Sequence, residues 1–112
     1  MSVDSRQVAV GLLAAVPFAR TLDIEFVEVA PEAEGGVRAV VRLPDNPEHR
    51  NHVGGPHAGA MFTLGETASG AVVLAELDAG QRPEFPVEVE IGTEDGTTTS
   101  VMTVTWTLRP NR

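Results

Sequence analysis

Hydrophobic and polar residues alternate along two stretches in the first half of the chain, which is the pattern of half-buried β-strands. One stretch runs from residue 22 to 29, and the next runs from 37 to 43. In the first stretch the alternation slips by one position around Val27, which predicts a β-bulge. Turn-forming residues 31 to 36 lie between the two stretches, so we expect an antiparallel hairpin.

Two further stretches near the C-terminus alternate in the same way. Residues 84 to 91 alternate apolar residues with Glu, and residues 98 to 108 place Met, Val, Trp and Leu on one face and Val and Thr on the other. The tripeptide Glu94-Asp95-Gly96 between them is a hairpin turn signal. A second antiparallel hairpin is therefore predicted.

Apolar residues recur at helical spacing in two other segments. Residues 4 to 7 can start a short helix whose apolar face continues to Val16, and Pro17 should end it. Residues 58 to 77 predict a second helix of about 20 residues, roughly 30 Å long. The order helix, hairpin, long helix, hairpin predicts one α+β domain over residues 1–112, with an antiparallel sheet around the long helix.

The segment that enters the long helix combines turn residues with a single carboxylate. Gly and Pro residues at 54 to 56 break the chain just before the helix. The first helical amides, near Ala58 and Gly59, lack partners within the helix and suit an anion or a polarised carbonyl oxygen. Glu66 lies about two turns further on, and its side chain leans back toward the same end. This arrangement places a candidate base beside a candidate oxyanion site.

The run from His57 to Ala68, HAGAMFTLGETA, resembles the signature of hotdog-fold acyl-CoA thioesterases of the phenylacetate-pathway type. It also resembles a related group of uncharacterised hotdog proteins in which HAG replaces HGG. The resemblance implies a hotdog fold, in which an antiparallel sheet wraps a central helix. It also implies hydrolysis of an acyl-CoA or related thioester.

The resemblance assigns roles residue by residue. Glu66 takes the place of the nucleophile or general base, the amide of Ala58 that of the group binding the thioester oxygen, and Asn51 that of the residue positioning thioester or water. Ala58 stands where many members have Gly, which matters little if only its amide is used. In the family the helix carboxylate of one chain faces the Asn-bearing loop of its partner, so a homodimer or homotetramer is expected.

The chain departs from the resembled family in length. The family carries a strand pair between the central helix and the final hairpin, whereas residues 75 to 84 here connect the two directly. About 30 to 40 residues are lacking, judging from two strands with their connections. Either the chain is a natural short form of the hotdog fold, or a segment with two strands is missing from the sequence.

Charge and composition narrow the partners. The net charge is −8, all eight basic residues are Arg, and they form no cluster, which argues against nucleic acid. Coenzyme A would need local cations, for which Arg50 and Arg82 are candidates, although both also fit solvated surface charges. The chain has no Cys, no run of about 20 apolar residues and no leader pattern, so we expect a cytoplasmic protein without membrane spans.

Each candidate residue also has a structural interpretation. Glu66 fits an exposed helix carboxylate, Asn51 fits a turn cap, and His57 fits either a general base or a residue that fixes the loop by bonding backbone. His49, His52 and His57 invite a zinc interpretation, but their spacing is not a known metal signature. No metal and no cofactor are therefore expected.

Three functions follow as alternatives. Thioester hydrolysis is favoured, with the carbonyl oxygen at the helix start and Glu66 as nucleophile or base. The second is hydration or dehydration of an acyl thioester, for which His57 or His52 would have to serve. The third is a hotdog protein that binds acyl-CoA without catalysis.

Overall fold

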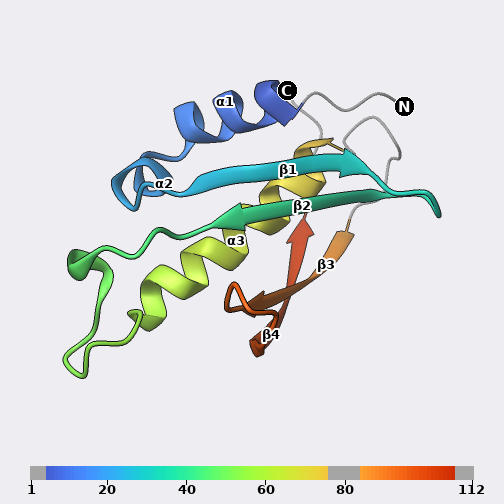
Figure 1. Cartoon of the computed structure of the whole chain (residues 1–112). Coiled ribbons are helices and arrows are strands. Elements are labelled where there is room, and N and C mark those ends of the chain that lie inside the picture. Colours follow the sequence, from blue (N-terminus) through green and yellow to red (C-terminus); the bar gives the residue numbers. More distant parts are fainter. Residues whose placement is uncertain (1–4, 76–83, 108–112) are drawn as a thin grey trace.

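A long central helix, α3, carries the other elements in the computed structural model, which describes residues 5–75 and 84–107 (Figure 1). In chain order the elements are α1 (Ser5–Ala15), α2 (Pro17–Thr21), β1 (Glu25–Pro31), β2 (Val37–Arg42), the 3-10 helix η1 (Pro47–His49), α3 (Ala58–Ala75), β3 (Glu84–Gly92) and β4 (Thr98–Thr107). The α+β class and the order helix, hairpin, long helix, hairpin are confirmed, with α2 and η1 as additions.

The first hairpin pairs β1 antiparallel to β2, with Glu25 opposite Arg42 and Pro31 opposite Val37. The register shifts between Phe26 and Glu28, so the predicted bulge around Val27 is confirmed. The strand itself begins three residues later than the alternation indicated.

Residues 22 to 24 were expected in the first strand but form the end of α2 and a turn. Pro17 ends α1 as predicted, yet it also starts α2, because Pro is favoured in the first turn of a helix. Leu22 caps the C-terminus of α2, and Asp23 has a φ of 56°. Leu22 and Ile24 are therefore buried in a turn. A two-residue spacing of apolar positions occurs in such a turn as well as in a strand.

Three small apolar clusters hold the elements on α3. One joins α1, both strands of the first hairpin and α3, and it contains Val8, Val29, Val37 and Ala71. A second joins α2 and its turn to α3, with Ala19, Leu22, Ile24 and Ala60. The third joins α3 to the second hairpin, with Val73, Phe85 and Val87. α3 contributes to every cluster, and by length and composition it is also apolar enough to cross a membrane.

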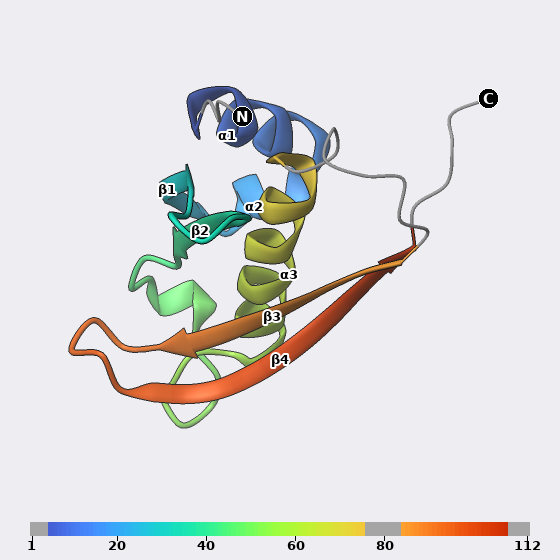
Figure 2. The same ribbon diagram turned by 90° about the vertical axis from the view of Figure 1, so that its right-hand side faces the viewer.

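The second hairpin pairs β3 antiparallel to β4 and lies across α3 (Figure 2). Two contacts fix the crossing besides the apolar cluster. The indole Nε1–H of Trp106 donates to the Ser69 hydroxyl at 3.0 Å. The Met102 sulfur lies so close to Gly65 that any side chain there would overlap with it. A glycine on α3 therefore lets the hairpin approach the helix backbone.

The described strands form two separate two-stranded sheets, whereas the sequence predicted one sheet around the helix. β2 and β3 both pack on α3, but neither pairs with the other. The predicted end of the central helix at Leu77, the last strand residue Leu108 and the short connection between helix and hairpin lie outside the described residues.

Candidate functional site

The loop that leads into α3 is folded by Asn51. The Asn51 side-chain oxygen accepts hydrogen bonds from the amides of Val53 and Gly55, both at 3.0 Å. The backbone N–H of Asn51 donates to the Gly55 carbonyl at 2.7 Å. Gly54 has a φ of 84°, a conformation that favours glycine. These contacts match the interpretation of Asn51 as a turn cap. The side-chain Nδ2 group makes a longer contact, 3.4 Å to the Pro56 carbonyl oxygen.

His57 is the N-cap of α3. Its Nδ1 atom accepts a hydrogen bond from the Gly59 amide at 2.9 Å, and its carbonyl accepts from the Met61 amide at 3.0 Å. Its own amide donates to the carbonyl of His49 at 2.8 Å, which ties the helix start to η1. The ring therefore satisfies one of the orphan amides of the first helical turn, as a capping side chain does.

Capping by His57 distinguishes the two amides that the sequence proposed for the oxyanion. The Gly59 N–H is taken by the His57 ring, so it is not available to a substrate. Ala58 is exposed, and its N–H has no hydrogen-bond acceptor within residues 5–75 and 84–107. Ala58 is also the first residue of α3, where the positive end of the helix dipole lies. Of the two amides proposed to bind the oxyanion, only that of Ala58 remains a candidate.

Glu66 is the only charged residue among the eighteen of α3. It is exposed and makes no ion pair or side-chain hydrogen bond with any described part of the chain. Phe62, one turn earlier on the same side, is 59% exposed. A carboxylate with no structural partner thus stands beside an exposed aromatic ring on a helix that is otherwise uncharged.

The spacing between Ala58 and Glu66 limits what one chain can do alone. Eight residues of α-helix rise about 12 Å, which is more than a side chain leaning back by one turn covers. One thioester therefore does not reach both groups of the same helix in a close, water-excluding contact.

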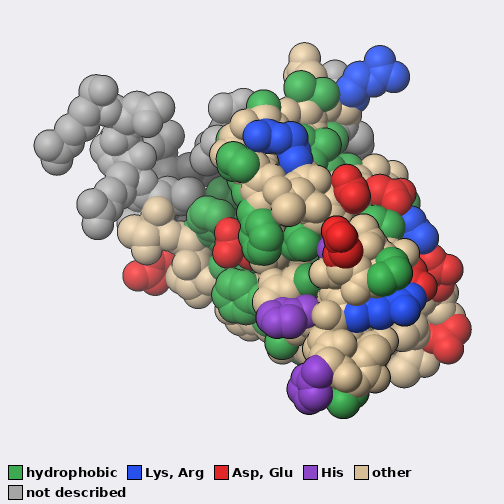
Figure 3. Space-filling view, turned by 90° about the vertical axis from the view of Figure 1, so that its left-hand side faces the viewer, with side chains coloured by type: hydrophobic (Ala, Val, Ile, Leu, Met, Phe, Trp, Pro, Cys, Tyr) green, Lys and Arg blue, Asp and Glu red, His purple; other side chains and the backbone are tan. Residues whose placement is uncertain are grey.

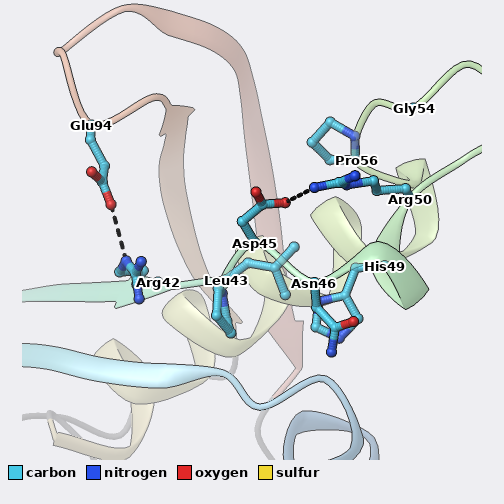
Figure 4. Close-up of a pocket in the computed structure, with 10 residues that line it drawn as sticks. Arg42, Leu43, Asp45, Asn46, His49, Arg50, Gly54, Pro56 and Glu94 are labelled. Atoms are coloured by element: carbon cyan, nitrogen blue, oxygen red, sulfur yellow. Dashed lines mark hydrogen bonds and ion pairs between the residues drawn. The ribbon is translucent and has the colours of Figure 1, made fainter.

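Arg50 lies at the polar end of the loop, while Arg82 lies outside the described residues. The Arg50 guanidinium donates to the Asp45 carboxylate at 2.8 Å (Figure 4). Both line a cavity of about 270 Å³ together with His49, which is 7% exposed. The His49 Nδ1 atom has no hydrogen-bond partner among the described residues. The sequence flagged His49 only as one of three histidines, because burial is not visible in a lone residue.

The three histidines do not assemble a metal centre. Within residues 5–75 and 84–107, no group of three or more His, Cys, Asp or Glu side chains is placed to hold an ion. On the face seen in Figure 3, histidine side chains lie at the surface, and the arginines are separated by acidic and apolar side chains. This face has no continuous basic patch of the kind that binds a nucleic-acid backbone.

Sequence reasoning missed Arg42, which joins the two hairpins. Arg42 on β2 donates to Glu25 on β1 at 2.6 Å and to Glu94 in the turn after β3 at 3.1 Å. The hydrogen bond to Glu94, with the charge of Glu25, raises the pKa of Arg42 above its ordinary value. Alternation placed Arg42 on the polar face of its strand, but no local signal identifies a partner fifty-two residues away.

Comparison with known proteins identifies one family. A family model described as a domain of unknown function, DUF4442, matches residues 4–83. No curated protein and no solved structure matches the chain. The matched residues include α1, the first hairpin, the Asn51 loop and the whole of α3 as described.

Proposed function

The chain belongs to the DUF4442 family, a domain family of unknown function, and we propose that it is a hotdog-fold thioesterase that hydrolyses an acyl-CoA or a related thioester. One observation carries the proposal. The only charge on α3 is an exposed carboxylate without a partner among the described residues, on a helix whose first amide is also exposed and unpaired.

The proposed reaction uses these two groups on opposite sides of the thioester carbonyl. The Ala58 N–H donates to the carbonyl oxygen and stabilises the negative charge that develops there. The Glu66 carboxylate takes a proton from water, which attacks the carbonyl carbon, or it attacks that carbon itself. The tetrahedral intermediate then expels the thiolate, which leaves as the thiol after protonation. On the second route an anhydride with Glu66 remains, and water hydrolyses it to release the acid and restore the carboxylate.

The His57 contacts support Glu66 as the base. Hydration or dehydration would need an imidazole free to exchange protons with the substrate, and the Nδ1 atom of His57 is bound to the Gly59 amide. Asn51 serves in this scheme as a positioning residue, since its side chain holds the loop that ends at the Ala58 amide.

A shared site between two copies resolves the 12 Å separation along α3. Glu66 of one chain would face the Ala58 amide of its partner, and the exposed Phe62 ring beside Glu66 would be covered by the same contact. We therefore expect a homodimer or a pair of such dimers, in which each chain gives one group to each site.

Replacing Glu66 with Gln tests the carboxylate directly. Glu66→Gln keeps the size of the side chain but cannot act as base or nucleophile, so thioester hydrolysis should fall by a factor of about 10² or more. Free thiol released from an acyl-CoA series measures the rate, and Glu90→Gln on the exposed face of β3 is the matched control. Equal turnover of the Glu66→Gln variant and the wild type would exclude Glu66 as the catalytic carboxylate.

Replacing Ala58 with Pro removes the proposed oxyanion donor without removing the helix. Pro is tolerated at the first helical position and has no N–H, so Ala58→Pro should fold but lose about 10² to 10³ in rate constant. Ala58→Gly keeps the N–H and should retain the rate. An active Ala58→Pro variant would rule this amide out.

Mixing the two inactive variants decides whether the site is shared. In a mixed dimer of Glu66→Gln and Ala58→Pro, one site would combine an intact Glu66 with an intact Ala58 amide from the other chain. Equal mixing and exchange should restore about a quarter of the wild-type rate, because half of the dimers are mixed and half of their sites are intact. A mixture that stays inactive although the chains exchange would place both groups within one chain.

A further inference from the structure

A groove runs between the two hairpins, with α3 as its floor. Its wider part is a cavity of about 730 Å³ between the end of β2 and the end of β3, lined by apolar side chains that include Val40, Leu43, Leu64 and Ile91. A narrower cavity of about 180 Å³ continues between the beginning of β2 and the middle of β3, above Ala68 and Val72 of α3. The groove therefore follows both strands for most of the length of β2.

Both walls of the groove are strand edges that pair with no further strand among the described residues. β2 is hydrogen-bonded to β1 alone and β3 to β4 alone among the described strands. The start of β2 and the middle of β3 line one cavity, and the ends of both strands line the other, so the two strands head toward the same end of the groove. Figures 1 and 2 show that they cross at an angle. Each edge presents backbone N–H and C=O groups that a further strand can pair with.

We propose that this groove is an acceptor site for an extended peptide strand supplied by another protein. A strand of about six residues, matching Val37–Arg42, would pair with β2 on one side and β3 on the other. It would join the two small sheets into one five-stranded sheet over α3. Alternate side chains would point onto the apolar floor, so the strand should carry apolar residues at every second position.

Two features of the chain support a strand as the occupant. Isolated two-stranded sheets are only marginally stable, and two of them are held here with their free edges on either side of one apolar helix face. Arg42 and Glu94 form an exposed ion pair that connects the two walls at one end of the groove.

A second copy of the chain is a poorer occupant. A strand that pairs on both sides must itself be unpaired, and every strand within residues 5–75 and 84–107 already has a partner. Three acidic residues and two arginines line the groove, namely Glu32, Glu88, Glu94, Arg38 and Arg42, so a neutral or basic peptide suits it better than an acidic one.

The site is independent of the proposed thioesterase chemistry. Leu64 lines the groove, whereas Glu66 lies two residues on, about 200° around α3. The peptide strand and the thioester would thus occupy opposite sides of the helix, and failure of either proposal leaves the other standing.

A capped nonapeptide that alternates Val and Thr, with a Lys at each end, is a suitable probe for the full chain. Its binding should slow backbone amide exchange in β2 and β3 together, by tenfold or more, as followed by NMR. The matched probe has the same side chains but methylated nitrogens at alternate residues. Because the N–H groups of alternate residues point to one edge of a strand, this N-methylation blocks pairing with one wall of the groove and keeps the apolar groups, so it should weaken binding by about tenfold or more.

A substitution in the groove floor tests the location. Ala68→Leu should fill the narrow part and weaken peptide binding by about tenfold, whereas Ala14→Leu on the exposed side of α1 should not. Equal binding of the N-methylated probe, protection confined to one strand, or no binding up to about 1 mM would each overturn the proposal. The same amides becoming protected by self-association without peptide would also overturn it. If Ala68→Leu fails to fold, the N-methylated probe still tests whether the peptide binds by strand pairing.

Discussion

The two hairpins share one sequence pattern but differ in what covers them. The β1–β2 hairpin lies beneath α1 and against α3, and Val29 in its middle is 1% exposed. The β3–β4 hairpin is buried where Phe85 and Val87 meet Val73 on α3, and Met102 and Trp106 of β4 also contact the helix. Toward its turn the burial of this face decreases, since Phe85 and Val87 are buried whereas Val89 and Ile91 are half-buried. Alternation of apolar and polar residues therefore reports which side chains share a face, and tertiary packing decides whether that face is buried.

Because the second hairpin is less buried, we expect it to unfold first. Phe85→Ala should give the largest loss of stability among the changes that test this. Removing this ring leaves a cavity in the small cluster on α3, and the expected cost is about 3 kcal/mol in free energy of unfolding. Hydrogen exchange should then show β3 and β4 opening before β1 and β2. For contrast, Val29→Ala should cost about 2 kcal/mol and loosen both hairpins together. Simultaneous opening in Phe85→Ala would show that the hairpins fold as one unit.

A smaller loss of stability is expected from removing the polar contact between the second hairpin and α3. Ser69 is fully buried, and its hydroxyl accepts from Trp106 and donates to the Glu66 carbonyl. Ser69→Ala leaves the half-buried indole N–H unpaired, for an expected cost of about 1 to 2 kcal/mol. Urea denaturation followed by circular dichroism measures it. Trp106→Phe combined with Ser69→Ala should cost less than the sum of the two single changes, and full additivity would contradict the coupling.

The smallest effect concerns the turn of the second hairpin. The Thr93 hydroxyl, followed by the Thr97 amide, donates to the Asp95 carboxylate and lowers its pKa from 3.8 to about 2. Because the folded pKa is the lower one, this contribution to stability is present above pH 3.8 and is lost as the pH falls toward 2. Thermal melts from pH 5 to 2 should fall less steeply for Asp95→Asn than for the wild type. Identical slopes would show that the turn does not hold the carboxylate.

Local elements of the fold were predictable because they depend on neighbours in sequence. Both hairpins, the bulge at Val27 and the start of α3 at Ala58 follow from alternation, turn residues and helical spacing. The strand predicted from residue 22 was wrong over its first three residues, because the turn after α2 gives Leu22 and Ile24 the same two-residue spacing of buried positions. The separation into two sheets was not predictable, since strand pairing over long distances leaves no periodic trace in the sequence.

The site residues remain a prediction, but some of their contacts were not predictable. Helix geometry proposed Ala58 and Glu66, the family resemblance added Asn51 and His57, and the structure assigned the Gly59 amide to the His57 ring. That assignment depends on the ring rotamer and the approach of η1, which spacing does not encode. Arg42 was missed because its partner Glu94 is distant in sequence, and His49 was named only as one of three histidines because its burial is not visible in the sequence.

The contact between Trp106 and Ser69 has a practical consequence. Trp106 is the only tryptophan in the chain, and it lies on the last described strand against α3. Its fluorescence therefore reports only the docking of the second hairpin, because the first hairpin contains no tryptophan. A strand entering the groove, a shift of β3 and β4 over the helix, or their early release would each be visible as an emission change in the unmodified protein.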